Sequence, residues 1–142
     1  MTRDALQARW TEVGEKLVTL AEEFPDDRYD ARPTMDVRSF AEQLRHVAFW
    51  NDYAARCLRG EAADGAANEL PRERYPTKRD IVPALRASFD AVGAVLATGH
   101  AAPDPTAQDT VVSFLEHGGE HYGQLVMYYR LAGLVPPASR DA

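Results

Sequence analysis

Two histidines four residues apart, His117 and His121, are the residues of this sequence best suited to chemistry. They lie in a long stretch with helical spacing of apolar residues, and side chains four apart lie above one another on one helix face. A third histidine, His46, lies on the inward side of an earlier helical segment. Three neutral imidazoles form a recurrent site for zinc or a similar divalent ion and leave at least one coordination position open. The pattern therefore predicts a three-histidine metal site that can admit a substrate.

The two helical stripes that carry these histidines also contain candidate pocket residues: Trp50, Tyr53, Gln124 and Tyr128. For the aromatic residues, the alternative is that they are ordinary residues of the bundle core. Gln124 is either the partner that holds an imidazole or a glutamine on the helix surface. Arg130, one residue off the ligand stripe, is interpreted as a structural cation, with recognition of a substrate carboxylate as the alternative.

The fourth histidine and the single cysteine are interpreted as structural. His100 lies in a linker, out of helical register with the other histidines, and we expect it to be exposed to solvent. Cys57 cannot form a disulfide within the chain, which favours a reducing compartment. We expect Cys57 to be a small buried residue, with a cysteine nucleophile as the alternative.

The elements that must position these residues are predicted to be four helices, because apolar residues recur at spacings of three and four in four segments and no segment shows sustained alternation. The predicted helices run from Leu6 to Phe24, from Ser39 to about Gly60, from Thr77 to Gly99, and from Asp109 or Thr110 to Gly133. The second and third open with capping-box sequences. Four helices with one apolar stripe each predict an all-α four-helix bundle.

The linker between the second and third helices, residues 59–76, is long for a bundle, in which connections usually span about 2–8 residues. Its length permits a long crossover, so that these two helices could run parallel. Its first part, Glu61 to Asn68, is small and polar, and we expect it to be mobile.

Three glycines interrupt the fourth helix at Gly118, Gly119 and Gly123, and each costs about 1 kcal/mol relative to alanine. At Gly118, which falls on the core stripe, we expect close approach of the neighbouring helix that would bring His46 within reach. The alternative is that one or two of these glycines mark weakly constrained surface positions.

The composition of the 142-residue chain fits one globular domain over residues 1–142, with 45% hydrophobic and 27% charged residues. The net charge of −6 disfavours binding to nucleic acid. Apolar windows are far shorter than the ~20 residues needed to cross a bilayer, so no membrane partner is expected. The charged N-terminus without an apolar segment favours a cytoplasmic protein.

The histidine sequences resemble those of the DinB-like (DinB/YfiT) superfamily over nearly the whole chain. The similar segments are Leu44-Arg45-His46-Val47-Ala48, His117-x-x-x-His121-Tyr122-Gly123-Gln124-Leu125, the entry to the second helix from Tyr29, and the ending from Tyr129 to Pro137. The resemblance implies a four-helix bundle with a long crossover and a divalent ion held by His46, His117 and His121. It also implies a homodimer. Zinc is the first expectation, with nickel or iron as alternatives.

Relatives in that family include metal-dependent transferases of low-molecular-weight thiols and a thiol-dependent isomerase. The resemblance therefore implies a metal-dependent thiol S-transferase that acts on small electrophiles in detoxification or stress. Glu116 and Glu120 neighbour the histidines, but their helical phase turns them away, so no general base is in place for hydrolysis. A metal-dependent hydrolase or isomerase and a non-catalytic metal-binding stress protein are the alternatives.

Overall fold

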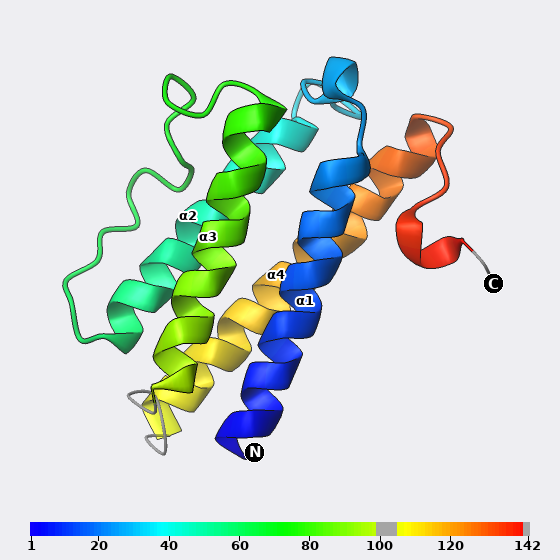
Figure 1. The fold of residues 1–142 in the computed structure, drawn as a ribbon. Helices are drawn as coiled ribbons and strands as arrows, with labels where there is room; N and C mark the ends of the chain where they lie inside the picture. The colour runs from blue at the N-terminus through cyan, green and yellow to red at the C-terminus, as the bar shows by residue number, and fades with distance from the viewer. Residues whose placement is uncertain (99–104, 141–142) are drawn as a thin grey trace.

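The computed structural model describes residues 1–98 and 105–140, and these form four long helices (Figure 1). The helices are α1 (Arg3–Glu23), α2 (Phe40–Leu58), α3 (Lys78–Ala97) and α4 (Pro105–Leu131). Two short 3-10 helices, η1 (Asp26–Arg28) and η2 (Pro137–Ser139), follow α1 and α4. The described residues contain no strand. The predicted all-α class and four-helix bundle are confirmed.

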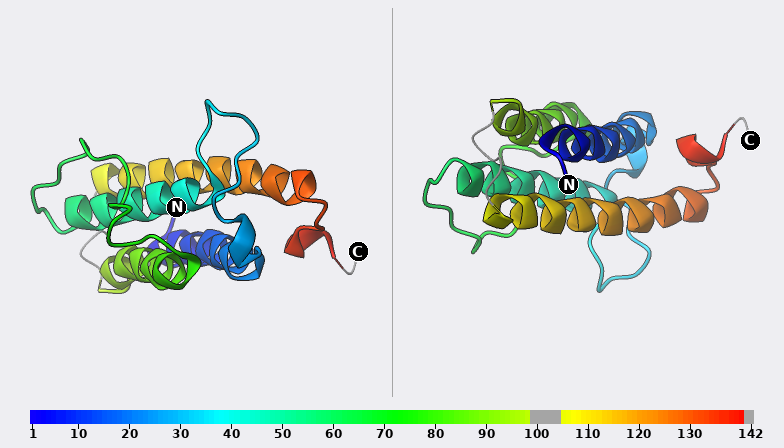
Figure 2. Two further views of the ribbon diagram at one scale, coloured as in Figure 1. Left: turned by 90° about the horizontal axis from the view of Figure 1, so that it is seen from above. Right: turned by 90° about the horizontal axis from the view of Figure 1, so that it is seen from below.

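The helices form a bundle in which α1 packs on α3 and α4, and α2 packs on α3 and α4. Figure 1 shows α1 and α4 running in one direction and α2 and α3 in the other. Seen from above and from below, the bundle has two layers, with α1 beside α3 in one and α2 beside α4 in the other (Figure 2). The parallel α2 and α3 are joined by a long crossover, as the length of the linker permitted.

Local capping fixes where the two central helices begin. The Ser39 hydroxyl accepts from the Glu42 backbone N–H at 3.1 Å, and the Glu42 carboxylate accepts from the Ser39 N–H at 3.0 Å. At the start of α3, the backbone N–H and hydroxyl of Thr77 both donate to the Asp80 carboxylate. These bonds satisfy backbone groups that a helix end leaves unpaired, so both predicted capping sequences are used.

An aromatic cluster closes the end of the bundle where α1 leads into α2. Phe24 stacks on Phe40 with ring centroids 3.9 Å apart, and Tyr129 lies 5.0 Å from Phe24. The Tyr129 hydroxyl donates to the Leu20 carbonyl at 2.6 Å, so its one polar atom is paired inside the core. This cluster holds α1, α2 and α4 in register.

The crossover, residues 59–76, runs back along α2 and is bonded to it. The Leu70 N–H donates to the Arg45 carbonyl at 3.2 Å. The buried Arg45 guanidinium donates to Glu69 and to the Tyr75 carbonyl, both at 3.1 Å. A Cβ at Gly65 would lie 2.7 Å from the Trp50 ring, so the chain passes this ring too closely for a side chain. The second half of the linker is thus anchored to α2, whereas the mobility predicted from the small polar sequence concerned the first part, Glu61 to Asn68.

Three positions differ from what the sequence predicted. Helix α4 begins at Pro105, four residues before Asp109, because proline lacks the N–H that a first helical residue leaves unpaired. A Cβ on Gly118 would lie 2.9 Å from the Val13 side chain, so this close approach is to α1, not to the helix of His46. Cys57, next to the last residue of α2, is exposed and not buried as the sequence predicted.

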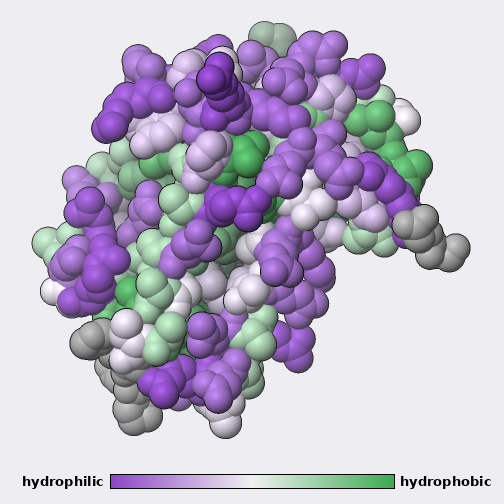
Figure 3. All heavy atoms as spheres, viewed as in Figure 1, coloured by the Kyte–Doolittle hydropathy of each residue, from purple (hydrophilic) through white to green (hydrophobic). Residues whose placement is uncertain are grey.

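The outer face of α1 and α3 is mostly hydrophilic, with apolar side chains in smaller patches (Figure 3). The core of the bundle contains the apolar residues of the four stripes. None of the helices in the described part of the chain is long and apolar enough to cross a membrane.

Candidate metal centre

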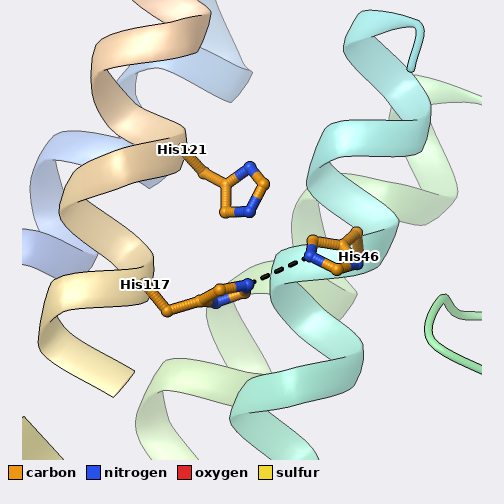
Figure 4. A group of neighbouring side chains, drawn as sticks. All are labelled: His46, His117 and His121. Carbon is orange, nitrogen blue, oxygen red and sulfur yellow. Dashed lines mark hydrogen bonds between the residues drawn. The ribbon is translucent and has the colours of Figure 1, made fainter. Parts of the chain in front are cut away.

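The three predicted histidines meet between α2 and α4. His46 projects from α2, and His117 and His121 project from successive turns of α4, with all three rings directed into the same space (Figure 4). The ring centroids lie between 4.5 and 4.9 Å apart. His46 and His121 are buried, and His117 is half-buried. The i,i+4 spacing on α4 and the packing of α2 against it therefore bring together the set that the sequence proposed.

Two of the imidazoles are held by outer hydrogen bonds that fix which nitrogen faces inward. The Nδ1–H of His46 donates to the Asn68 carbonyl at 2.7 Å. The Nδ1–H of His121 donates to the side-chain oxygen of Gln43. A neutral imidazole with its proton on Nδ1 presents a lone pair on Nε2. Both rings are thus held in the tautomer that a metal ligand needs, by partners of the kind that surround metal-bound histidines.

The third imidazole is less constrained. Since the His46 Nδ1 carries a proton, the His117 Nε2–H donates to the His46 Nε2, 3.0 Å away. This leaves His117 Nδ1 as the one buried side-chain nitrogen or oxygen in the described residues without a hydrogen-bond partner. A divalent ion would replace the proton between the two rings, because metal ligands must present lone pairs.

The separation of the ring nitrogens fits a small divalent ion. One candidate ligand atom from each histidine can be chosen so that all three lie within 4.8 Å of one another. Zinc binds imidazole nitrogen at ~2.0–2.1 Å, so ligand atoms of a tetrahedral site lie about 3.4 Å apart. The upper limit of 4.8 Å exceeds this by about 1.4 Å, so ring movements of up to roughly an ångström separate the two arrangements. The donor set is all nitrogen, which suits zinc, nickel and iron alike.

Burial keeps the three imidazoles neutral. It lowers the pKa of His121 to about 3, and the charges of His117, His46 and Arg38 act in the same direction. Burial also lowers the pKa of His117 to about 4, helped by His46 and Arg38. The pKa of His46 is lowered by burial and by Arg38, against the bond to the Asn68 carbonyl. Neutral imidazoles are the form that binds metal, so the site is ready for an ion at neutral pH.

An apolar wall borders one side of the histidines. Trp50 lies with its ring centroid 6.5 Å from His46, and it packs on Tyr53 at 4.9 Å. Phe114 of α4 stacks near Trp50 at 6.3 Å and contacts the His117 ring edge-on. The Trp50 N–H donates to the Asn68 side-chain oxygen at 2.7 Å, so the crossover fixes this wall.

A polar wall borders the other side. Gln43 donates from its amide nitrogen to the Gln124 side-chain oxygen at 2.7 Å and lies 3.4 Å from the Tyr128 hydroxyl. The Tyr128 hydroxyl donates to the Arg38 carbonyl. Gln124 therefore reaches the His121 imidazole only through Gln43. Gln43, Gln124 and Arg38 also line an open groove of about 520 Å³.

Four residues of the site were not proposed from the sequence: Gln43, Asn68, Phe114 and Arg38. Gln43 and Phe114 lie on the ligand stripes, so their spacing could have identified them. Asn68 and Arg38 lie in loops, where no periodicity indicates a direction. Asn68 adopts a left-handed φ of 60°, a conformation that asparagine tolerates better than most residues, and this turns its carbonyl and side chain toward α2.

The remaining charged candidates lie away from the site. Glu116 and Glu120 are both exposed, as their helical phase predicted. Arg130 is exposed and forms no ion pair within the described residues. His100 falls outside the described residues. No carboxylate is therefore among the groups that contact the three imidazoles in the described part of the chain.

In a comparison with protein families, the chain matches the model of the DinB superfamily over residues 9–125. The matched range begins in α1 and ends in α4, and it includes all three histidines. Comparison with curated proteins found no match.

Proposed function

Because the chain belongs to the DinB superfamily and carries three convergent histidines, we propose that it is a metal-dependent transferase that joins a low-molecular-weight thiol to a small electrophile. His46, His117 and His121 are the proposed ligands, and zinc is the proposed ion, with nickel or iron as alternatives. The biological role proposed for this reaction is detoxification or response to stress.

The proposed reaction forms a thioether. The thiol releases its proton to solvent, its sulfur forms a bond to the electrophilic carbon, and the leaving group departs with the electrons of the bond that breaks. A divalent ion on three neutral imidazoles would supply the Lewis acid that favours the thiolate form at neutral pH. The chain itself would hold the rings, through Asn68 and Gln43, and exclude water with the apolar wall.

The observation that carries this proposal is a set of three neutral imidazoles with no carboxylate of the described residues in contact. Hydrolysis of an ester or amide generally needs a base within hydrogen-bond reach of the attacking water. Glu116 and Glu120 are exposed and point elsewhere. A thiol that ionises readily needs no such base, so the composition of the site supports thiol chemistry over hydrolysis.

The two walls suggest how substrates would be placed. The apolar wall of Trp50, Tyr53 and Phe114 is proposed to hold the body of the electrophile. On the polar side, Gln124 and Tyr128 are proposed to border the entrance to the site, and they also restrain Gln43, which orients His121.

Metal content is the first test. Protein purified without an affinity tag or chelator should carry about one divalent ion per chain by mass spectrometry, and His46→Ala and His121→Ala should each lose most of it. Asn51→Ala is the matched control, because Asn51 is a buried polar residue of α2 that bonds to α3 instead. Metal retained in both histidine variants, or little metal after reconstitution of the wild type, would contradict the proposed site.

Activity is the second test, with loaded protein, a chromogenic electrophile and a panel of small thiols. We expect consumption of the electrophile that requires both a thiol and the metal and that is lost in His121→Ala. Hydrolysis of an ester panel without any thiol would instead support the alternative hydrolase. Isomerisation of a substrate with the thiol regenerated would support an isomerase, and bound metal without turnover would support a metal-binding stress protein.

The remaining expectations belong to the same proposal. A homodimer in the cytoplasm, acting on a small molecule and not on nucleic acid, is consistent with the net charge of −6. Met127 and Leu131 of α4 are exposed apolar residues that could contribute to self-association. Light scattering of the purified chain measures its oligomeric state directly.

A further inference from the structure

Arg38 stands at the polar edge of the three-histidine site. It directly precedes Ser39, the N-cap of α2, and its carbonyl accepts from the Tyr128 hydroxyl of α4. The side chain of Arg38 is half-buried. It lines the same groove of about 520 Å³ as Gln43, and Gln43 bonds to His121. The groove therefore places Arg38 beside Gln43, the residue that bonds to His121, and the three histidines themselves are not among its lining residues.

Arg38 is a cation without a partner within the described residues. Other arginines near it are paired: Arg32 of the same groove bonds to Glu42, and the buried Arg45 bonds to Glu69. Arg38 forms no side-chain hydrogen bond or ion pair there, although Asp36 and Glu42 line the same groove. A half-buried guanidinium that the protein leaves unpaired retains its capacity for a two-pronged bond to an anion.

Arg38 is also the one charged residue whose field acts on all three imidazoles. Its positive charge contributes to lowering the pKa of His46, His117 and His121, and no acidic residue of the described part of the chain offsets it at any of them. With a divalent ion in place, the ion would add positive charge to that of Arg38. Such a site attracts anions and favours substrates that carry negative charge beside the reacting atom.

We propose that Arg38 binds a carboxylate on the thiol substrate, which makes the preferred substrate a small thiol acid. This inference rests on the proposed function. The carboxylate is assigned to the thiol, because the thiol sulfur is the group that must reach the three histidines. Arg38 is connected to one of them, His121, through Tyr128 and Gln43. The guanidinium would pair with the carboxylate while the sulfur occupies the site, and the body of the electrophile would approach from the apolar wall.

The test uses two thiols that differ in one group, mercaptoacetate and mercaptoethanol, with cobalt-loaded protein. Binding is read from the sulfur-to-cobalt absorption band, so the measurement does not depend on turnover. A carboxylate can also bind cobalt directly, so the ratio of the two dissociation constants is compared between proteins. We expect Arg38→Gln to reduce the preference for mercaptoacetate about tenfold, the effect of losing one charge-assisted pair.

Two further variants complete the test. Arg130→Gln removes the same charge from an exposed arginine of α4 and should leave the ratio as in the wild type. Arg38→Lys keeps the charge but removes the planar fork, so it should retain part of the preference. It also provides a folded variant should Arg38→Gln fail to hold cobalt.

The outcomes separate the two proposals. An unchanged ratio in Arg38→Gln overturns the role of Arg38 and leaves thiol binding intact. The same conclusion follows if Arg130→Gln loses as much of the preference as Arg38→Gln does while Arg38→Lys keeps it in full. Absence of the absorption band with both thiols in the wild type overturns the proposed thiol chemistry, and the inference fails with it. A reduced ratio in Arg38→Gln alone supports the thiol acid.

Discussion

Helix α2 contributes to two buried polar clusters, and they differ in how completely their hydrogen bonds are satisfied. Toward α3, the Asn51 side-chain amide donates to the Ser88 hydroxyl at 3.1 Å, and Ser88 donates to the Leu85 carbonyl at 2.7 Å. Toward α4, His46 meets His117, whose Nδ1 is buried without a partner. The first cluster forms a closed chain of bonds, and the second is incomplete.

This difference indicates which cluster is structural and which is suited to a ligand. A buried polar group costs free energy unless it is paired, so a protein gains stability by completing such a chain of bonds. The Asn51–Ser88 pair does so, and neither side chain is among the buried atoms without a partner in the described residues. The histidine cluster keeps inward-facing lone pairs on His46 and His121, which are the groups that an ion would satisfy.

The largest expected difference between the two clusters is in how they make the free energy of unfolding depend on pH. In metal-free protein, His117 and His121 have folded pKa values of about 4 and about 3, below the ordinary 6.5 of the unfolded chain. The unfolded state therefore binds more protons, and the stability contributed above pH 6.5 is lost as the pH falls. We expect the free energy of unfolding to decrease by about 3 kcal/mol between pH 7 and pH 5.

Urea unfolding at a series of pH values measures this loss. Asn51→Ala should show the same pH dependence as the wild type, because neither Asn51 nor Ser88 titrates. His121→Phe should show a shallower one. If the free energy of unfolding of the wild type did not change over this range, the imidazoles would be binding protons in the folded protein as readily as in the unfolded chain.

Breaking the closed cluster should have the next largest effect. Asn51→Ala removes the donor to Ser88 and leaves a small cavity beside α3. We expect a loss of about 2 kcal/mol in the free energy of unfolding, measured at pH 7 in metal-free protein. Metal content should be unaffected. A variant as stable as the wild type would show that the Asn51–Ser88 bond is not a structural contact of consequence.

Removing the unpaired ring of the open cluster should have the smallest effect. His117→Leu deletes the buried nitrogen without a partner but also the bond to His46, and these two contributions oppose one another. We therefore expect the metal-free protein to change in stability by less than about 1 kcal/mol. His121→Leu, which leaves the Gln43 oxygen unpaired, should cost more. If thermal unfolding showed a lower melting temperature for His117→Leu than for His121→Leu, the description of the histidine cluster as incomplete at His117 would be wrong.

The fold was predictable from the sequence because its signals are local. Apolar spacing of three and four defines each stripe, and the Ser39 and Thr77 capping sequences mark where α2 and α3 begin. The start of α4 was harder to predict, because the residues before Asp109 carry little apolar pattern and proline there is compatible with a first turn. The partner of Gly118 depends on which helices become neighbours, and local spacing does not determine that.

The candidate site was predictable only as far as it lies on helix faces. The i,i+4 spacing of His117 and His121 sets their common direction, and the stripe of His46 sets which side of α2 it occupies. Gln124 is a candidate partner of an imidazole from the sequence because it lies three residues after His121. The actual partner is across the helix interface, where register decides the contact. Asn68 and Arg38 depend on the paths of two loops.

Asn68 joins the crossover to the site through two bonds, one to His46 and one to Trp50. Local opening of this segment would therefore release the His46 ring and the apolar wall together, since the same residue restrains both. Any ligand that needs His46 held in place would, by linkage, oppose that opening. The order of a loop with few apolar residues of its own is thus coupled to occupancy of a site on the helices beside it.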